Sequence, residues 1–334
     1  MALSFIASVF LVSGAIHSAS ATPIASSFKA KRSTIPDYAL TYAPYSHLWS
    51  EEEWWPSDIA THVEHVTPEV DYVAVASSVT LEDLDTFSTD TYLTSNDNVE
   101  DNPAWLLSAE NEPDDDGYSA APATIICSDK TDYVDCFYFY FYSYNHGNKF
   151  LGTRYGNHVG DWEHTMVRFV DGSPEYIYLS AHDSGTAYTY SALTQTDNRA
   201  TTYIAGGSHA NYVSAGKQDY VAALLGTLSD TTDSGPYWDV TANYRGFWYD
   251  ADSETFTSAG GADIGATEQT TEGVSWLSWL GHWGDEQYKT SDSRQSCLVG
   301  ECHYVSGPTG PFNKNLGRTA VCEDEDDCTI ESSI

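Results

Sequence analysis

The stretch RYGNHVGDWEHTMVRFV, residues 154–170, joins a polar loop that carries a histidine to a run of alternating side chains. Such alternation is typical of a β-strand, in which successive side chains point to opposite faces. The two faces of the predicted strand carry Asp161, Glu163, Thr165, Val167 and Phe169 on one side, and Trp162, His164, Met166 and Arg168 on the other. Two carboxylates therefore lead into an apolar face, and we expect the chain to be organised around this strand.

The two carboxylates are close enough to share one cation. Neighbours on one face of a strand lie about 6.5–7 Å apart at the backbone. His158 lies in the loop between Gly156 and Gly160 and could add an imidazole. This mixed nitrogen and oxygen set suits Zn or Mn, while Ca and Mg remain open. The alternative is that the acids pair with Arg154 or Arg168 and that His158 only hydrogen-bonds within its loop.

Residues 133–144, YVDCFYFYFYSY, predict a second, central strand. The segment is aromatic and β-prone throughout, which is the pattern of a strand covered on both faces. Residues 154–170 end at a turn over 171–174, Asp-Gly-Ser-Pro, which predicts a hairpin. The sequence therefore predicts a mainly β (α+β) fold, an antiparallel β-sandwich stapled by disulfides, with peripheral helices and long loops.

Two other predicted strands meet histidines. Residues 175–182, EYIYLSAH, alternate and end at His182, and residues 202–205 break at a pair of glycines that delivers Ser208 and His209. Antiparallel neighbours would bring these groups together with the carboxylates of residues 154–170. This convergence favours a functional site more strongly than any single residue does.

Other segments carry weaker patterns. Asp58 is placed to cap a short helix over residues 59–66, and residues 221–228 have the composition of a second one. Residues 89–123 are polar and rich in Asn, Asp, Glu and Pro, which predicts a long surface loop.

A tryptophan-rich segment, SWLSWLGHWGDEQY over residues 275–288, surrounds His282 and Asp285. Such a segment predicts either the rim of a pocket or a packed aromatic corner.

The first 32 residues have the pattern of a processed leader. Residues 1–21 combine a short apolar run with a small-residue cleavage pattern, as in a secretory signal. Residues 22–32 end in a dibasic pair and form a predicted propeptide, which leaves residues 33–334 as a single large β-rich domain with an acidic tail from about residue 319. No later stretch reaches eighteen apolar residues, so we expect no transmembrane segment. The expected location is the secretory pathway, then the medium, the cell wall or the vacuole.

The chain is strongly acidic, with 49 acidic against 14 basic residues and a formal charge of −35. All of the acids and 11 of the bases follow residue 32, so the predicted mature chain carries −38. Such a charge repels nucleic acid and anionic lipid, attracts cations and favours solubility. It excludes nucleic acid as a partner and suits a protein secreted into acidic media. The sequence says nothing of the oligomeric state.

Six cysteines in a predicted secreted chain indicate disulfides rather than thiol chemistry. They lie in three sequence-local pairs, Cys127 with Cys136, Cys297 with Cys302, and Cys322 with Cys328. Three local bridges are the simplest connectivity, and a bridge between Cys302 and Cys322 remains open.

Residues 37–318 resemble a known family. YAPYSHLWSEEEWWPSDIATHV, the stretch at 154–170, YIYLSAHDSG, GGSHANYVSAG, GHWGDEQY and GPTGPFNKNL are similar to segments of the fungal vacuolar protein sorting-associated protein 62 family. The family name implies a role in vacuolar delivery and does not imply a reaction.

Residues 140–216 also resemble the necrosis-inducing toxin family of plant-associated microbes, whose signature is GHRHDWE. This chain has NHVGDWE there, so the resemblance implies a divalent-cation site at His158, Asp161 and Glu163, with His209 as a further ligand. The chain departs from the signature at Gly160. The family's remaining acidic ligand falls near Asn145 or His146.

These patterns lead to one preferred function and one alternative. The expected cofactor is one divalent cation, Ca, Mg, Mn or Zn, held by the four ligands just named, and the preferred function is cation-dependent binding of a glycan or a lipid headgroup. The alternative is a metal-dependent hydrolase of an extracellular or vacuolar polymer, with His182 and Glu163 as catalytic groups. The candidate substrate-binding residues are Trp162, Ser208, His282 and Asp285. A serine-hydrolase elbow at GGSHA lacks its final glycine, and a glycosidase pair rests on a weak Asp-x-Glu signal.

Overall fold

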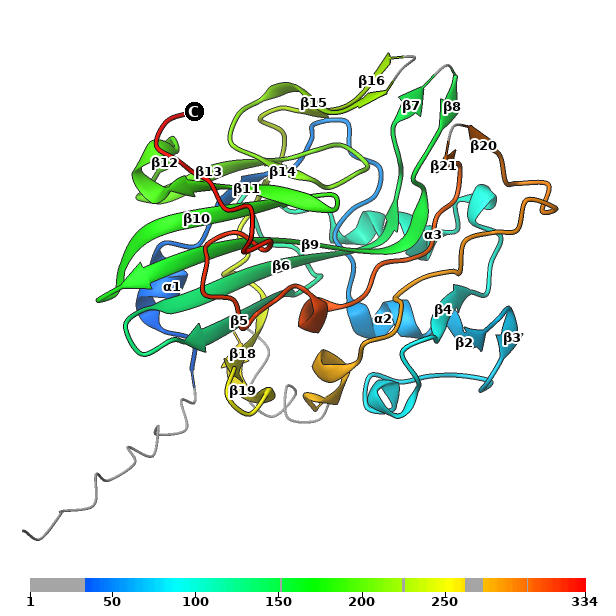
Figure 1. Ribbon diagram of the computed structural model, residues 1–334, viewed down its shortest axis with the longest axis horizontal. Helices are drawn as coiled ribbons and strands as arrows, with labels where there is room; N and C mark the ends of the chain where they lie inside the picture. The colour runs from blue at the N-terminus through cyan, green and yellow to red at the C-terminus, as the bar shows by residue number, and fades with distance from the viewer. Residues whose placement is uncertain (1–33, 151, 224–225, 262–272, 299) are drawn as a thin grey trace, which may run out of the picture. The chain divides into compact units, whose positions relative to one another are not determined.

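The computed structural model describes residues 34–150, 152–223, 226–261, 273–298 and 300–334 (Figure 1). The predicted leader and propeptide lie outside the described residues, so their boundaries stay predictions. The described part is mainly β, as expected, and its largest element is an eight-stranded sheet. The strands follow the order β19 (Thr255–Gly261), β18 (Tyr244–Asp250), β5 (Ala123–Asp129), β6 (Val134–Asn145), β9 (His158–Val170), β10 (Ser173–Ala181), β11 (Ser184–Thr189) and β22 (Ile330–Glu331).

This sheet is mixed rather than purely antiparallel. Five of its pairs are antiparallel, but β18 runs parallel to β5 and β22 runs parallel to β11. Both parallel strands come from segments distant in sequence, which can add to a sheet without the hairpin that forces antiparallel pairing. The expectation of an antiparallel sheet is therefore corrected, and the sandwich arrangement stays a prediction.

A smaller sheet packs against the large one. Its strands are β12 (Gln195–Thr196), β13 (Arg199–Ile204), β1 (Tyr45–His47) and β17 (Tyr237–Trp238), with β14 (Asn211–Tyr212) paired to β13. The ring of Trp238 lies 5.4 Å from that of Tyr140 on β6, and the hydroxyls of Ser46 and Tyr140 are 3.4 Å apart. These contacts hold the loop after β13, which carries Ser208 and His209, close to the centre of the large sheet.

Strand β6 is covered on both faces, as its aromatic sequence predicts. On one face Phe137, Phe139 and Phe141 pack into a cluster with Trp162 of β9, and on the other Tyr138, Tyr140 and Tyr142 pack into a second cluster. Burial of each such ring contributes about 1.5–3 kcal/mol. This strand is therefore a rigid support for β9.

The helices are short and lie outside the large sheet (Figure 1). They are α1 (Asp37–Thr41), α2 (Ile59–Val63) and α3 (Ala104–Leu107), with single 3-10 turns at Leu84–Thr86, Val99–Asp101, Ala109–Asn111, Tyr190–Ala192, Ser275–Ser278 and Pro311–Asn313. The predicted cap of α2 is confirmed, because the amide of Ala60 donates to the Asp58 carboxylate at 3.2 Å. The helix ends at Val63, before the expected residue 66.

Two local predictions were wrong. Strands β15 (Gly216–Ala223) and β16 (Gly226–Thr232) pair antiparallel, so the described part of residues 221–228 is strand and not the expected helix. The cross-strand pairing overrides the helical composition of a short Ala- and Leu-containing segment. The expected loop at 89–123 holds β4 (Tyr92–Ser95), α3 and two of the 3-10 turns. β4 pairs with β2 (Val66–Val70), which also pairs with β3 (Val73–Ala74).

The remaining short strands are β7 (Lys149–Phe150), β8 (Thr153–Arg154), β20 (Cys297–Leu298) and β21 (Glu301–Cys302).

The three local disulfides are confirmed. Cys127 on β5 stands directly opposite Cys136 on β6, with their Cα atoms 4.1 Å apart, and the other bridges join Cys297 to Cys302 and Cys322 to Cys328. Each bridge closes a hairpin or turn that the backbone already makes.

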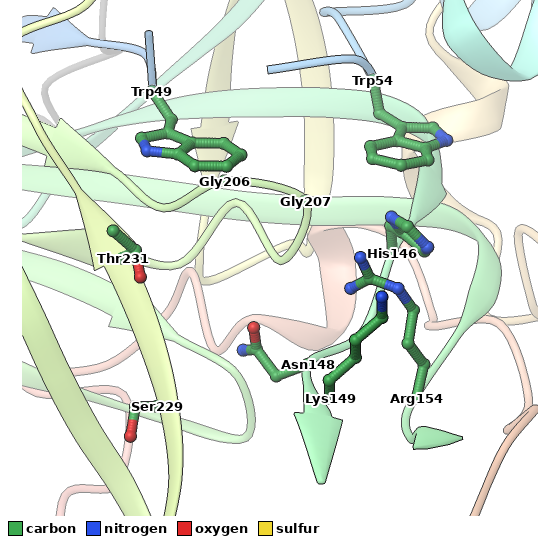
Figure 2. Close-up of a pocket in the computed structure, with 10 residues that line it drawn as sticks. All are labelled: Trp49, Trp54, His146, Asn148, Lys149, Arg154, Gly206, Gly207, Ser229 and Thr231. Carbon is green, nitrogen blue, oxygen red and sulfur yellow. The ribbon is translucent and has the colours of Figure 1, made fainter. Parts of the chain in front are cut away.

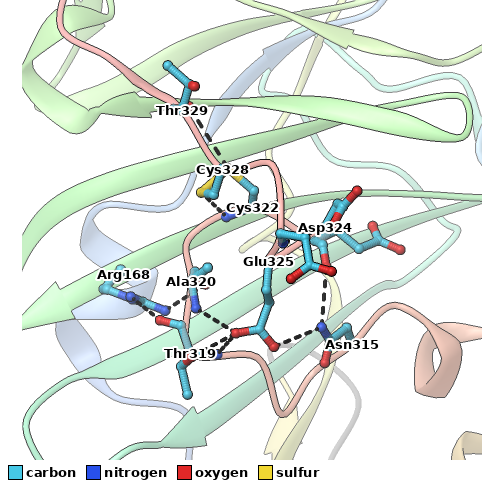
Figure 3. Close-up of a disulfide and its surroundings, with 11 residues drawn as sticks. Arg168, Asn315, Thr319, Ala320, Cys322, Asp324, Glu325, Cys328 and Thr329 are labelled. Atoms are coloured by element: carbon cyan, nitrogen blue, oxygen red, sulfur yellow. Dashed lines mark hydrogen bonds between the residues drawn. A yellow bond between two sulfur atoms is a disulfide. The ribbon is translucent and has the colours of Figure 1, made fainter.

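The acidic segment after residue 319 is tied to β9 (Figure 3). Arg168 donates to both carboxylate oxygens of Asp135 at 2.8 Å and also to the carbonyls of Thr319 and Ala320. Glu325 accepts from the amides of Thr319 and Ala320 and so closes a turn.

Among the described residues, no helix is long and apolar enough to span a bilayer.

Candidate functional site

The start of β9 lies beside the loop that carries His209. Asp161 is 5% exposed, and its Oδ2 lies 2.8 Å from Nδ1 of His209, which is fully buried. The imidazole stacks on the ring of Tyr142, with centroids 3.5 Å apart and planes 2° from parallel. Tyr142 is in turn the β6 partner of Asp161 in the sheet register. The structure therefore brings together the two segments that the sequence pattern placed at one site.

The arrangement favours a positively charged His209. Its Nε2 lies 3.2 Å from the carbonyl of Trp54, which can only accept, so Nε2 carries a proton. Burial alone would lower the pKa of His209, but the hydrogen bond to Asp161 and the charge of Glu52 raise it above its usual value. Glu52 Oε2 lies 4.0 Å from Nε2. The imidazolium is thus the counterion of two buried carboxylates.

Glu163 is held by β10 and the residue after it. The Ser180 hydroxyl donates to Glu163 Oε2, and the backbone amide of His182 donates to Oε1 at 3.1 Å. Burial, and next the charge of Asp161, raise the pKa of the Glu163 carboxyl to about 8. The side chain therefore favours its protonated form at neutral pH.

Asp230 on β16 is a buried hub that joins three other segments. It accepts from His182 Nε2 at 2.8 Å, from the Ser208 hydroxyl at 2.5 Å, and from Tyr212 and Asn148 at 2.6 Å each. Burial would raise the pKa of Asp230, but the bonds from His182 and Ser208 lower it below its usual value. His182 is raised in pKa by the same pair despite its burial. Ser208 thus donates to the acid rather than to a histidine, and both side chains are buried.

Two of these histidines have unusual backbone conformations. His182 has φ of 58° and His209 has φ of 56°, both in the left-handed region. Such a conformation costs a non-glycine residue about 1–3 kcal/mol, and it persists where the surroundings impose it. These two imidazoles are therefore held in position at a cost in folding stability.

The four predicted cation ligands do not form a cage as they lie. His158 donates Nδ1 to the Gly160 carbonyl at 2.6 Å, and burial lowers its pKa, so it is neutral. Both nitrogens of His209 are used by Asp161 and Trp54. Within the described ranges, no three His, Cys, Asp or Glu side chains converge to hold a metal ion. The residues present do not fit a bound cation without rearrangement, and the ligand set stays a prediction.

A hollow of about 310 Å³ adjoins this network (Figure 2). We name it the tryptophan hollow; it is lined by Trp49, Trp54, His146, Asn148, Lys149, Arg154, Gly206, Gly207, Ser229 and Thr231. Figure 2 shows Lys149 and Arg154 side by side on one wall, pointing toward His146 and Trp54. Asn148 donates to Asp230 and the Trp54 carbonyl accepts from His209, so the hollow and the network share walls.

The other predicted site residues lie elsewhere. Trp162 is buried in the aromatic cluster, and its ring is 5.3 Å from that of Trp283. His282 stacks on Tyr92 with centroids 4.2 Å apart. Asp285 lines a second hollow of about 370 Å³, and burial raises the pKa of its carboxyl to about 6. Neither His282 nor Asp285 lines the tryptophan hollow.

Sequence reasoning did not place four residues at this site. Asp230 and Glu52 are single acids among 49, and nothing in the pattern around either one marks a buried hub. Lys149 and Arg154 offered a signal, because basic residues are scarce in this chain. They also lie close in sequence to the glycine-rich start of β9.

Fold and site together define a disulfide-bonded, mainly β protein with a buried network of histidines and carboxylates. Residues 148–292 match the family model described as vacuolar protein sorting-associated protein 62. Vacuolar protein sorting-associated protein 62 of Saccharomyces cerevisiae is 35% identical over 328 residues, which cover 88% of this chain and 68% of the yeast protein. A second S. cerevisiae protein, TDA6, is 36% identical over 327 residues, covering 86% and 68%. The chain therefore belongs to the vacuolar protein sorting-associated protein 62 family.

Solved structures of the toxin class that residues 140–216 resemble also match, at a distance. The crystal structure of the non-toxic HaNLP3 protein is 11% identical with a TM-score of 0.30, covering 72% of this chain and 92% of that one. Necrosis and Ethylene inducing Protein 2, from the causal agent of cocoa's Witches Broom disease, is 12% identical with a TM-score of 0.29, covering 55% and 72%. These scores are too low to establish a shared fold.

Proposed function

We propose that this family member is a binding protein for a glycan or a lipid headgroup, and that the ligand occupies the tryptophan hollow. The observation that supports this proposal is the shared wall between the hollow and the buried network. Two indoles and several polar groups face the hollow, which is the usual make-up of a ligand pocket. Behind that wall, His209 is bonded to Asp161 and to the Trp54 carbonyl, and Asp230 accepts from four side chains, so that these groups form a rigid support.

Burial argues against the hydrolase alternative. Ser208 is 2% exposed and Glu163 is 4% exposed, so neither side chain is open to a polymeric substrate as it lies. Only His182 of these groups is substantially accessible, with 28% of its side chain exposed. A binding role uses such a closed network as it stands, whereas turnover would require it to open.

The proposal is tested with purified mature protein and a panel of glycans and headgroup-bearing vesicles, followed by tryptophan fluorescence. We expect saturable binding that Trp49→Ala weakens by about 2- to 12-fold, the equivalent of an aromatic contact of about 0.5–1.5 kcal/mol. Trp49→Phe, which keeps a ring, is the matched control. The binding proposal is wrong if the panel is hydrolysed and the activity disappears in His182→Ala.

The divalent cation is a separate element of this proposal. A cation at Asp161 and Glu163 would share these carboxylates with the present hydrogen bonds from His209 and Ser180, and His209 would have to give up one of its own bonds to become a ligand. Elemental analysis of wild type beside Asp161→Ala tests whether the cation binds. One equivalent of metal that is lost in the variant would establish the cation site. No metal in either protein, after incubation with Ca, Mg, Mn and Zn, would leave the His209 imidazolium as the counterion.

Family membership and the three disulfides agree with a place in the secretory pathway or the vacuole, since disulfides persist in oxidising compartments. Release to the medium or the cell wall belongs to the proposal. Immunogold labelling of a chain that carries an internal epitope would locate the protein.

A further inference from the structure

We propose that the tryptophan hollow selects a phosphorylated sugar, with the phosphate on Lys149 and Arg154 and the sugar ring against the tryptophans. This inference deepens the proposed function and rests on it for the sugar. The assignment of a phosphate rests on independent features of the hollow.

The first feature is a concentration of positive charge in a strongly acidic chain. Only 11 basic residues follow residue 32, and two of them, Lys149 and Arg154, line this one hollow. None of the described residues that line it is Asp or Glu. Five other basic side chains form ion pairs with carboxylates, namely Arg168, Arg199, Lys217, Arg245 and Arg294. Within the described part of the chain, neither cation of the hollow has such a pair.

The second feature is the placement of the two cations on one hairpin. Lys149 on β7 and Arg154 on β8 are direct partners in the sheet register. Like charges directly opposite each other destabilise a strand pair, so the arrangement has no benefit for folding. An anion between the two side chains would turn this repulsion into attraction.

The electrostatics of the hollow agree with an anion. Burial, together with the charges of Arg154 and Lys149, lowers the pKa of His146 to about 3, so this imidazole is neutral. Burial also lowers the pKa of Arg154, although the nearby Tyr144 hydroxyl and the Glu53 carboxylate oppose that change. The hollow therefore carries two positive charges from its lining, which a phosphate dianion matches and a single carboxylate does not.

The geometry provides for both parts of the ligand. Arg154 Nη1 donates to the Gly147 carbonyl at 2.7 Å, which anchors the guanidinium and leaves its other N–H groups for an anion. The Trp49 ring lies directly on Gly206, where an added Cβ would come within 2.1 Å of it. Trp54 is held by His146, with ring centroids 3.8 Å apart. Two fixed indoles beside two cations suit an apolar sugar face that carries a phosphate.

The net charge of the protein favours a small ligand over a membrane surface. At a formal charge of −38 the predicted mature chain is repelled by an anionic bilayer within about one Debye length, about 8 Å at physiological salt. A single phosphate that enters the hollow meets the local cations instead. We therefore infer a soluble sugar phosphate rather than the same group displayed on a lipid surface.

Isothermal titration with the full mature chain tests this inference, with glucose 6-phosphate, glucose and inorganic phosphate as probes. We expect wild type to bind glucose 6-phosphate at least about tenfold more tightly than either of the other two. Lys149→Gln should weaken that binding at least about tenfold and so reduce the preference for glucose 6-phosphate over glucose. Lys217→Gln, on the neighbouring hairpin, is the matched control and should bind as wild type does.

Other outcomes separate this inference from the proposed function. Neutral glycans that bind wild type and Lys149→Gln alike, with no preference for glucose 6-phosphate, would overturn the inference and leave the proposed function standing. Binding of inorganic phosphate alone, with no sugar bound, would overturn the sugar part and the proposed function together. Sedimentation with vesicles that contain phosphatidylinositol 4-phosphate, without affinity for soluble probes, would overturn the choice of a soluble ligand.

Discussion

Asp230→Asn is the substitution whose effect the structure specifies most fully. The carboxylate accepts four hydrogen bonds, whereas the amide keeps one oxygen, which can serve two donors. Two donors would then face the amide N–H groups, and His182 would lose its counterion. Removing one partner from a buried charged pair costs about 3–5 kcal/mol, and we expect a loss of that size in the free energy of unfolding.

The loss should depend on pH. The folded state lowers the pKa of Asp230, so its contribution is present above the unfolded value and fades as the pH falls through the folded one. The folded state raises the pKa of His182, so that contribution is complete below about pH 6.5 and fades as the pH rises through the folded value. Wild type and variant should therefore differ most near pH 5 and less near pH 9.

Guanidinium unfolding at these two pH values, with the disulfides intact, measures both effects. Asp219→Asn is the matched control, because Asp219 lies on the same hairpin but pairs with Lys217 at the surface. We expect the control to leave the unfolding midpoint unchanged. A change within about 0.5 kcal/mol of wild type for Asp230→Asn, the range of ordinary surface substitutions, would refute the description of Asp230 as a buried hub.

Three further predictions concern other parts of the molecule. Replacing Cys127 and Cys136 together by serine should cost about 3 kcal/mol, as expected for a closed loop of about ten residues, and denaturant midpoints with and without the bridge measure it. Wild type should lose up to about 3 kcal/mol of stability as the pH rises from 4 through 6, because burial raises the pKa of Asp285 to about 6 in the folded state. Asp285→Asn should not show this loss. Melting temperatures across that range measure it, and a variant with the same slope against pH as wild type would show that the reasoning is wrong. Arg168→Met should cost about 3–5 kcal/mol by leaving Asp135 buried without its cation, and a double variant with Asp135→Leu should recover part of that loss in a thermodynamic cycle.

The strands of the large sheet could be predicted where one physical rule dominates. In β6 residues 137–142 are all aromatic over both faces, and in β9 the period of two is unbroken from Asp161 to Phe169. Periodicity alone therefore placed both strands. The helix predicted at 221–228 is different, because a short segment takes its conformation from the partner strand that it meets. The partner of β15 is β16, and no local pattern in residues 221–228 indicates that pairing.

The candidate site shows the same division. Asp161 and His209 could be brought together from the sequence, because each stands at the end of a predicted strand. The protonation of His209 could not be predicted from the sequence, since it depends on the Trp54 carbonyl and on Glu52, both more than 100 residues away in the chain. The family resemblance named the residues of a cation site. The contacts that compete with a cation are visible only in three dimensions.

The short strand β22 has a consequence for how this protein behaves in concentrated solution. Residues 330–331 pair with Ala187 and Tyr188 and so cover part of the outer edge of β11. An uncovered sheet edge offers its amides and carbonyls to any extended chain nearby, including another copy of the same protein. A fusion or truncation that displaces this segment would expose that edge. We then expect gradual self-association, which begins at β11 and requires no loss of the native core.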